Sequence, residues 1–138
     1  MELWFVVYAS PAPQGSMKAF VIAGQARVTS DNKKTMPYRH MVTMMARHKM
    51  ATENINEPMA AKHVPVKINL EFHLARPKSI PKKRTAPAVK PDLDKLVRAT
   101  CDALKGVLYV DDGQVTELRA RKCYAEGPEM VVIGLETL

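Results

Sequence analysis

Residues 90–115 read KPDLDKLVRATCDALKGVLYVDDGQV, and this stretch carries the clearest local pattern in the chain. Apolar residues recur at helical spacing over 92–105, while Pro91 and Gly106 suit the start and the end of a helix. The spacing therefore predicts an amphipathic helix with charged residues on its outer side. Its buried face should carry Leu93, Leu96, Val97, Thr100, Cys101 and Leu104, and its outer face Asp94, Lys95, Arg98 and Asp102.

The second half of the stretch predicts a strand followed by a turn. Residues 107–110 are apolar and β-prone, and Asp111, Asp112 and Gly113 are turn residues before a further strand expected from Gln114. The stretch thus has aspartates at both ends. We expect the helix and the turn to bring three or four carboxylates together.

Length and charge limit the classes of protein that fit. The chain has 138 residues and 46% hydrophobic content, which suits one domain over 1–138. Lysine and arginine number 21 against 14 acids, a net charge of +7, so a polyanionic partner is the first to test. A solvated positive face explains the same charge, so composition alone does not decide.

The N-terminus and the cysteines favour a cytoplasmic location. Residues 1–10, MELWFVVYAS, carry Glu2 where a signal peptide has positive charge, and the apolar run is too short to span a bilayer. Cys101 and Cys123 form no CxxC motif, and no histidine stands at ligand spacing from them. We expect reduced structural thiols. Four histidines are expected to face solvent: His40, His48, His63 and His73.

The N-terminal third predicts a strand, a hairpin and a helix. The strand is expected at 3–9, apolar throughout and covered on both faces, and the hairpin at 20–23 and 26–29, turning at Gly24 and Gln25. A helix is expected from Pro37. One face of this helix should carry Tyr38, Met41, Val42, Met45 and Lys49. Its methionines are most simply core, although a methionine-rich helix can also be an adaptable binding surface.

The remainder predicts three strands and a basic loop. Residues 66–74 alternate between apolar and polar, which predicts a half-buried central strand. Residues 115–124 and 130–135 predict two strands, and 126–128 should close a hairpin between them. Residues 76–90, RPKSIPKKRTAPAVK, contain no acid and predict a mobile loop that can hold a phosphate backbone beside the aspartates.

The predicted fold class is α+β, a single domain with a mixed β-sheet and two main helices in the approximate order β-β-β-α-β-α-β-β-β. The aspartates admit two interpretations. Asp92 can be an N-cap, Asp94 a first-turn acid, and Asp111 and Asp112 parts of a tight turn. The same carboxylates can instead ligate Mg²⁺, which prefers oxygen ligands and polarises a phosphodiester. Arg98 can steady the transition state or simply pair with Asp94.

The stretch closely resembles the signature of the RusA-type Holliday-junction resolvases: an Asp-Leu-Asp helix start, Asp-Ala-Leu at the helix end, and an Asp-Asp-x-Gln-Val turn. Residues 13–20 (PQGSMKAF), the run DNKK at 31–34, and Tyr38 with Arg39 resemble phage or prophage members of that family. Residues 44–90 match only in general character.

The resemblance implies a RusA-like fold and a set of site residues. Asp92, Asp94 and Asp112 take the positions of the catalytic, metal-binding carboxylates, with Asp111 beside them as a further metal ligand and Asp102 as a matching helix acid. Arg98 stands where the family usually has an essential lysine, and Lys95 replaces a common asparagine, so either can fill the cationic role. The DNA-contact candidates are Lys18, Arg27, Lys33, Lys34, Lys82, Lys83, Arg84, Lys90 and Lys95.

The resemblance further implies a Mg²⁺-dependent endodeoxyribonuclease of DNA recombination and repair, with Mn²⁺ as a substitute metal. It implies a homodimer that binds four-way DNA junctions and nicks two strands symmetrically, in the cytoplasm of a bacterial host and without a membrane partner. The alternative is a basic, non-catalytic DNA-binding accessory protein whose aspartates are only caps and turns.

Overall fold

The computed structural model describes residues 1–15, 17–30 and 32–138. In this part of the chain the elements follow the order β-β-β-α-β-α-β-β, with a short 3₁₀ helix, η1, before the seventh main element. Their bounds are β1 Glu2–Val7, β2 Met17–Ile22, β3 Gln25–Ser30, α1 Thr35–Thr52, β4 Val66–Leu74, α2 Leu93–Leu104, η1 Asp112–Gln114, β5 Val115–Tyr124 and β6 Met130–Thr137. The predicted class, α+β with a mixed sheet and two helices in one domain, is confirmed.

Four strands form the main sheet in the order β1-β6-β4-β5. The β4–β5 pair is parallel, and the β1–β6 and β4–β6 pairs are antiparallel. Strand β4 is therefore an inner strand, as its alternating sequence predicted, and its burial alternates along all nine residues. The polar residues of β4 point to the face opposite the helices.

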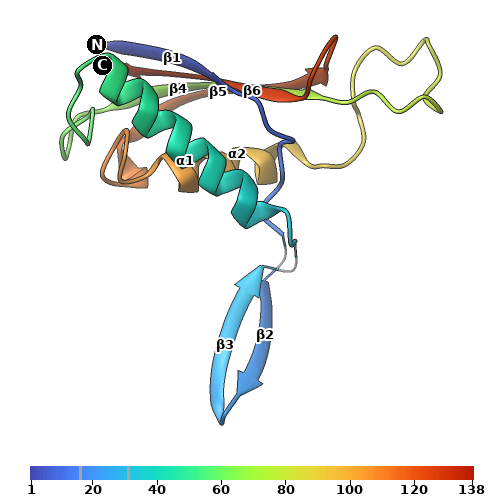
Figure 1. Cartoon of the computed structure of the whole chain (residues 1–138), viewed down its shortest axis with the longest axis horizontal. Helices are drawn as coiled ribbons and strands as arrows, with labels where there is room; N and C mark the ends of the chain where they lie inside the picture. The colour runs from blue at the N-terminus through green and yellow to red at the C-terminus, as the bar shows by residue number, and fades with distance from the viewer. Residues whose placement is uncertain (16, 31) are drawn as a thin grey trace.

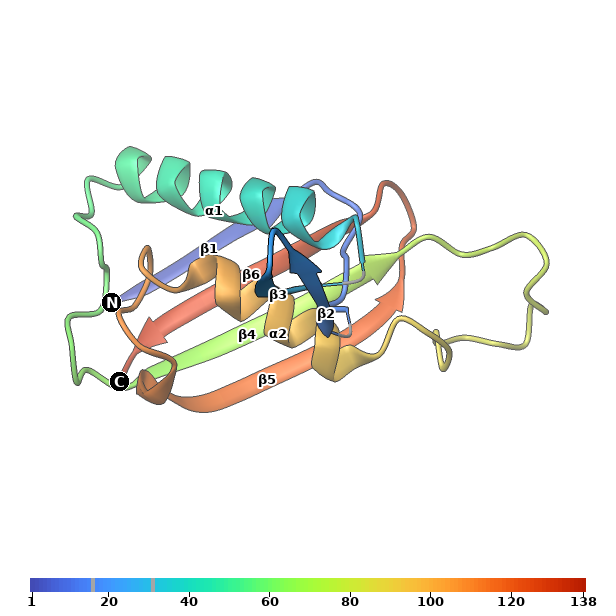
Figure 2. The same ribbon diagram turned by 90° about the horizontal axis from the view of Figure 1, so that it is seen from below.

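Helices α1 and α2 lie on one face of the sheet (Figures 1 and 2). Their contact includes a buried 2.7 Å hydrogen bond between the hydroxyls of Tyr38 and Thr100, and Thr43 Oγ1 donates to the Ala103 carbonyl at 2.8 Å. The apolar side chains of both helices and of the inner sheet face form one core. Helix α2 is thus fixed along its length, and its two ends are held at defined places.

In the described part of the chain, no helix covers the opposite face of the sheet (Figure 1). On this face the indole of Trp4, 47% exposed, lies directly over Gly134, where an added Cβ would meet ring atoms at 2.6 Å. The prediction that the first strand is covered on both faces is therefore wrong. Burial in β1 alternates because only one face of the strand meets the helices.

The predicted strand at 107–110 does not form. These residues make a turn with isolated bridges from Tyr109 to Lys105 and to Ala60, and the amide of Gly106 donates to the Tyr109 carbonyl at 2.7 Å. Val107, Leu108 and Tyr109 are nonetheless fully buried. Their apolar character reflects burial in the core rather than extended backbone.

The predicted hairpin between the last two strands is also wrong. Strands β5 and β6 follow each other in sequence, but β4 lies between them and pairs with both. The connection that contains residues 126–128 therefore passes across β4 instead of joining two neighbouring strands. Strand β5 consequently forms an edge of the sheet, beside the end of the 76–90 loop.

Helix α1 buries Tyr38 and Val42 of the predicted face, but the rest of the buried face is shifted toward Ala46 and Met50. Its buried residues are Thr35, Tyr38, Val42, Ala46 and Met50. Met41 and Met44 are 40% and 52% exposed, so the assignment of the methionines to the core fails for these two. Met45 is partly buried against the core.

The predicted hairpin forms from β2 and β3 and projects away from the body (Figure 1), but its turn lies one residue earlier than expected, because Gln25 already belongs to β3. It turns at Ala23 and Gly24, and both residues have a positive φ. In the described part of the chain, no helix is long and apolar enough to cross a membrane.

Candidate metal and nucleic-acid site

The first pair of aspartates lies at the start of α2. Asp92 occupies the N-cap position in extended conformation, and Asp94 follows in the first turn. The Asp92 carboxylate makes no side-chain capping hydrogen bond; Lys95 Nζ lies 3.9 Å from its Oδ2. Both aspartates are exposed. The hydrogen bond that would make Asp92 a side-chain cap is therefore absent, and its carboxylate can bind another cation.

A cleft lies beside Asp92. Its volume is about 520 Å³, and its wall includes the loop of residues 10–15 and the side chains of Lys34, Lys90 and Lys95. The amide of Gln14 donates to the Lys95 carbonyl at 3.0 Å, which attaches the loop to α2. Three cations and one exposed carboxylate thus share a cleft. This combination suits a phosphate backbone held next to a carboxylate-bound cation.

The second pair of aspartates lies beyond the other end of α2. Asp112 begins η1, and Lys105, the C-terminal cap residue of α2, places its Nζ 3.7 Å from Asp112 Oδ2. Burial raises the pKa of the Cys101 thiol to about 11, and the negative charges of Asp112 and Asp102 act in the same direction. Asp102 therefore lies at this end of the helix, in the neighbourhood of Asp112.

Within one chain the two pairs do not meet. Helix α2 has twelve residues, a length of about 18 Å at 1.5 Å per residue, and it separates Asp92 and Asp94 from Asp111 and Asp112 (Figure 2). Among the described residues, no three of these carboxylates lie within 4.8 Å of one another. The expectation that helix and turn gather them is wrong for a single chain, because residues close in sequence stand at opposite ends of a rigid helix.

Gln114 fixes the position of the Asp111–Asp112 segment. Its Oε1 accepts hydrogen bonds from the amides of Val110 and Asp111 at 2.8 and 2.9 Å. Its Nε2 donates to the carbonyls of Ala61 and Val64 at 2.8 and 2.9 Å. The side chain is buried, so four backbone groups depend on one amide. The sequence contained Gln114 in the Asp-Asp-x-Gln-Val motif but gave no sign of this anchoring role.

Replacing Gln114 by alanine should lower the free energy of unfolding by about 3 kcal/mol, because it leaves buried backbone groups without partners. Urea denaturation measures this change. Asn56→Ala, at an exposed position in the loop after α1, serves as the control and should change stability by less than about 0.5 kcal/mol. Equal effects of the two substitutions would contradict the anchoring role.

The basic loop of residues 76–90 is attached at both ends. Arg76 lies 5.0 Å from the centre of the Tyr124 ring and donates to the carbonyls of Arg84 and Pro81 at 2.7 Å each. Lys122 Nζ donates to the carbonyls of Val89 and Pro91 at 2.6 and 2.9 Å. The loop extends from the body between these attachments (Figures 1 and 2). Its mobility stays a prediction.

The other candidates are exposed on several elements, or their side chains fall outside the described part of the structure. Lys82, Lys83 and Arg84 are exposed in the basic loop, and Lys33 is exposed before α1. Arg98 is exposed on α2, one turn after Asp94. The backbone positions of Lys18 in β2 and Arg27 in β3 are described, but their side chains lie outside the described part of the structure.

The protein is a small α+β protein in which two helices cover one face of a mixed sheet. At the start of α2 an aspartate lies in a cationic cleft, which suits the binding of nucleic-acid phosphates. Residues 10–135 match the family model for "Endodeoxyribonuclease RusA", and the chain belongs to that family. The family comprises endonucleases that resolve Holliday junctions. The chain is also 29% identical over 139 residues to the uncharacterized protein YqaN of Bacillus subtilis (strain 168), covering 94% of this chain and 92% of that protein.

Proposed function

We propose that this protein is a metal-dependent resolvase that acts as a homodimer on four-way DNA junctions and nicks two strands symmetrically. The observation that carries the proposal is the cleft at the start of α2, where Asp92 lies among Lys34, Lys90 and Lys95. The cations can position a phosphate, and the carboxylate can hold the metal next to it. The family match supplies the DNA substrate class.

The donor set at the helix start fits Mg²⁺, with Mn²⁺ as a substitute. Asp92 and Asp94 offer carboxylate oxygens to solvent, and Mg²⁺ commonly binds one or two carboxylates while keeping water and phosphate ligands. When bound, the ion lowers the pKa of an attacking water and stabilises the leaving oxygen. Lys34, Lys90 and Lys95 hold the DNA strand, and Arg98 or Lys95 supplies positive charge near the cut phosphate.

Asp112 and Asp111 can contribute to the proposed metal site only if a second protomer is present. They lie about one helix length from Asp94 in their own chain, so they cannot share its ion there. In a twofold dimer with the two α2 helices antiparallel, Asp111 and Asp112 of each chain would lie beside Asp92 and Asp94 of the other. We infer that each metal site takes its carboxylates from both protomers. Such an arrangement couples cleavage to dimerisation.

The remaining lysines and arginines extend the DNA-contact surface away from the cleft. Residues 82–84 form the exposed part of the basic loop, and Lys18, Arg27 and Lys33 lie in or next to the β2–β3 hairpin. Phosphate contacts of this kind set the position of a junction without reading its sequence. The site of action is the bacterial cytoplasm, in DNA recombination and repair.

The direct test is incubation of the purified protein with a synthetic four-way junction, with Mg²⁺, with Mn²⁺ and with EDTA. We expect paired nicks at symmetric positions in two opposing strands with either metal, and none with EDTA. Linear duplex of the same sequence serves as the control substrate and should remain intact. Junction binding without cleavage under both metals would support the accessory-protein alternative and refute the nuclease.

A further inference from the structure

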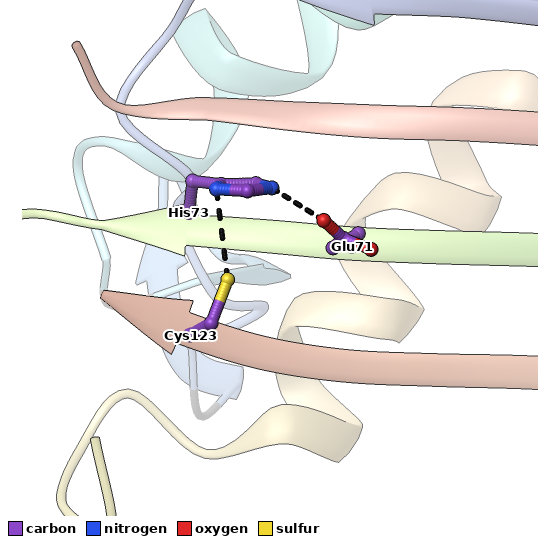
Figure 3. A group of neighbouring side chains, drawn as sticks. All are labelled: Glu71, His73 and Cys123. Carbon is purple, nitrogen blue, oxygen red and sulfur yellow. Dashed lines mark hydrogen bonds and ion pairs between the residues drawn. The ribbon is translucent and has the colours of Figure 1, made fainter. Parts of the chain in front are cut away.

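A cluster of three polar side chains lies on the uncovered face of the sheet: Glu71, His73 and Cys123 (Figure 3). His73 on β4 is in register with Cys123 on β5, and Glu71 stands two residues before His73 and therefore on the same face. The sequence offered no such grouping, because the parallel β4–β5 pairing joins residues 50 positions apart. His73 lies on the uncovered face as expected, but it is only partly exposed, and its contact with Cys123 could not be seen from the spacing of histidines and cysteines in the sequence.

The imidazole of His73 is held between the other two side chains. Its Nε2 lies 2.7 Å from Glu71 Oε1, and its Nδ1 lies 3.5 Å from Cys123 Sγ. The second oxygen of Glu71 accepts a hydrogen bond from Nε of Arg121 at 2.9 Å, and Nη2 of Arg121 forms an ion pair with it at the same distance. Both carboxylate oxygens are therefore engaged, and Glu71 is fixed in its orientation.

The charge on Glu71 determines which ring nitrogen carries the proton. Partial burial alone would raise the pKa of Glu71, but the hydrogen bonds from Arg121 and His73 lower it overall. The ring tautomer that donates a hydrogen bond to this carboxylate carries its proton on Nε2. Nδ1 is then free of a proton on the side of the ring near Cys123, and a carboxylate bound to the other ring nitrogen is the second-sphere arrangement that orients histidine ligands of metals.

The separation of these two atoms matches a known coordination geometry. Zinc binds histidine nitrogen at about 2.0–2.1 Å and cysteine sulfur at about 2.3 Å, so a tetrahedral angle sets the two ligand atoms about 3.6 Å apart. The observed distance between Nδ1 and Sγ is 3.5 Å. We propose that His73 and Cys123 bind a zinc-type divalent cation between β4 and β5, with Glu71 orienting the histidine and water completing the coordination.

This site is separate from the proposed Mg²⁺ site in both chemistry and position. Its donors are nitrogen and sulfur, which favour Zn²⁺ or Co²⁺, whereas the aspartates offer only oxygen. It lies on the sheet face opposite α2. Because a cysteine ligates as its thiolate, binding releases one proton from Cys123 Sγ as the sulfur–metal bond forms. A bound cation would fasten the end of edge strand β5 next to Lys122, which holds the loop leading to Asp92.

Titration of the reduced full-length protein with Co²⁺ tests the proposal. We expect a near-ultraviolet sulfur-to-cobalt charge-transfer band that Zn²⁺ abolishes, and a higher melting temperature in Zn²⁺ than in EDTA. Cys123→Ser and His73→Ala should lose the band. Glu71→Gln should weaken Co²⁺ binding by roughly 10- to 100-fold, the usual cost of removing an orienting carboxylate.

Two control variants make the test specific. Cys101→Ser removes the other free thiol and should retain the band in full. Asp94→Asn should retain it too, so the result does not depend on the nuclease proposal. Absence of the band in the wild-type protein, or its loss in Cys101→Ser with retention in Cys123→Ser, would refute the site and leave a hydrogen-bonded surface network.

Discussion

Asp94→Asn is expected to abolish cleavage of a four-way junction while the protein still folds and binds the junction. The substitution removes one carboxylate charge from the proposed ligand pair and preserves the shape of the side chain. A metal that activates water and stabilises the leaving oxygen contributes several kcal/mol, so the cleavage rate should fall by about three powers of ten or more. Single-turnover cleavage with saturating protein measures the chemical step.

The fold should tolerate this change. Asp94 is exposed in the first turn of α2, where a negative charge contributes only about 0.3–1 kcal/mol through the helix dipole. Glu126→Gln, which removes an exposed carboxylate from the turn before β6, is the control and should cut at the wild-type rate. Wild-type cleavage by Asp94→Asn, with binding unchanged, would exclude Asp94 from the reaction.

Mixing two inactive proteins should restore cleavage. If each metal site combines Asp94 of one protomer with Asp112 of the other, a dimer of Asp94→Asn with Asp112→Asn contains one site with both aspartates intact and one site with neither. Each single variant alone has two damaged sites. We expect the mixture, after unfolding and refolding together, to nick one strand of the junction, with up to half of the dimers being the mixed species.

The same mixture distinguishes shared sites from sites within one chain. If Asp94 and Asp112 served one site in the same chain, both sites of the mixed dimer would be damaged and the mixture would stay inactive. A double variant carrying both substitutions in one chain, mixed with wild type, provides the matched control: under the shared-site arrangement both of its mixed sites lack one aspartate. Rescue by the two single variants, together with cleavage in this control that comes only from the wild-type homodimers and falls as the double variant is added in excess, would establish the exchange.

Regular patterns in the sequence predicted the local elements well. The alternation over 66–74 gave β4 its bounds, and the apolar spacing with Pro91 and Gly106 gave α2 to within one residue at each end. In both elements one face packs against the core and the other does not, so the order of apolar and polar residues follows the pattern of burial. The hairpin before α1 was predicted in the same way, although its turn lies at Ala23 and Gly24, one residue earlier than predicted.

The pairing of strands could not be read from these patterns. Alternation of apolar and polar residues identifies a strand but does not show which strand pairs with it. The position of β5 on the far side of β4 from β6 was therefore not predicted. Residues Val107 to Tyr109 illustrate a related limit, because full burial produces an apolar run in a turn as readily as in a strand. Exposed Met41 and Met44 show the converse, since apolar residues can also remain on the surface.

The sequence predicted which residues belong to the candidate site but not how they are arranged. The motif selected both pairs of aspartates, and the structure exposes them to solvent. Their separation follows from the rigid length of α2, which sequence proximity conceals. Lys90 and Lys95 of the cleft flank Asp92 in sequence, whereas Lys34 is distant in sequence and could be placed beside Asp92 only once the chain was folded.

The strand order has a consequence for how the protein forms during synthesis. Strand β1 has β6 as its neighbour in the sheet, and β6 also lies between β1 and β4. The sheet therefore cannot assemble as the strands emerge from the ribosome in sequence, because its second strand is synthesised last. Contacts this distant in sequence slow folding, and β1 must wait with its apolar residues exposed. Any nuclease activity is thus acquired only after synthesis of β6.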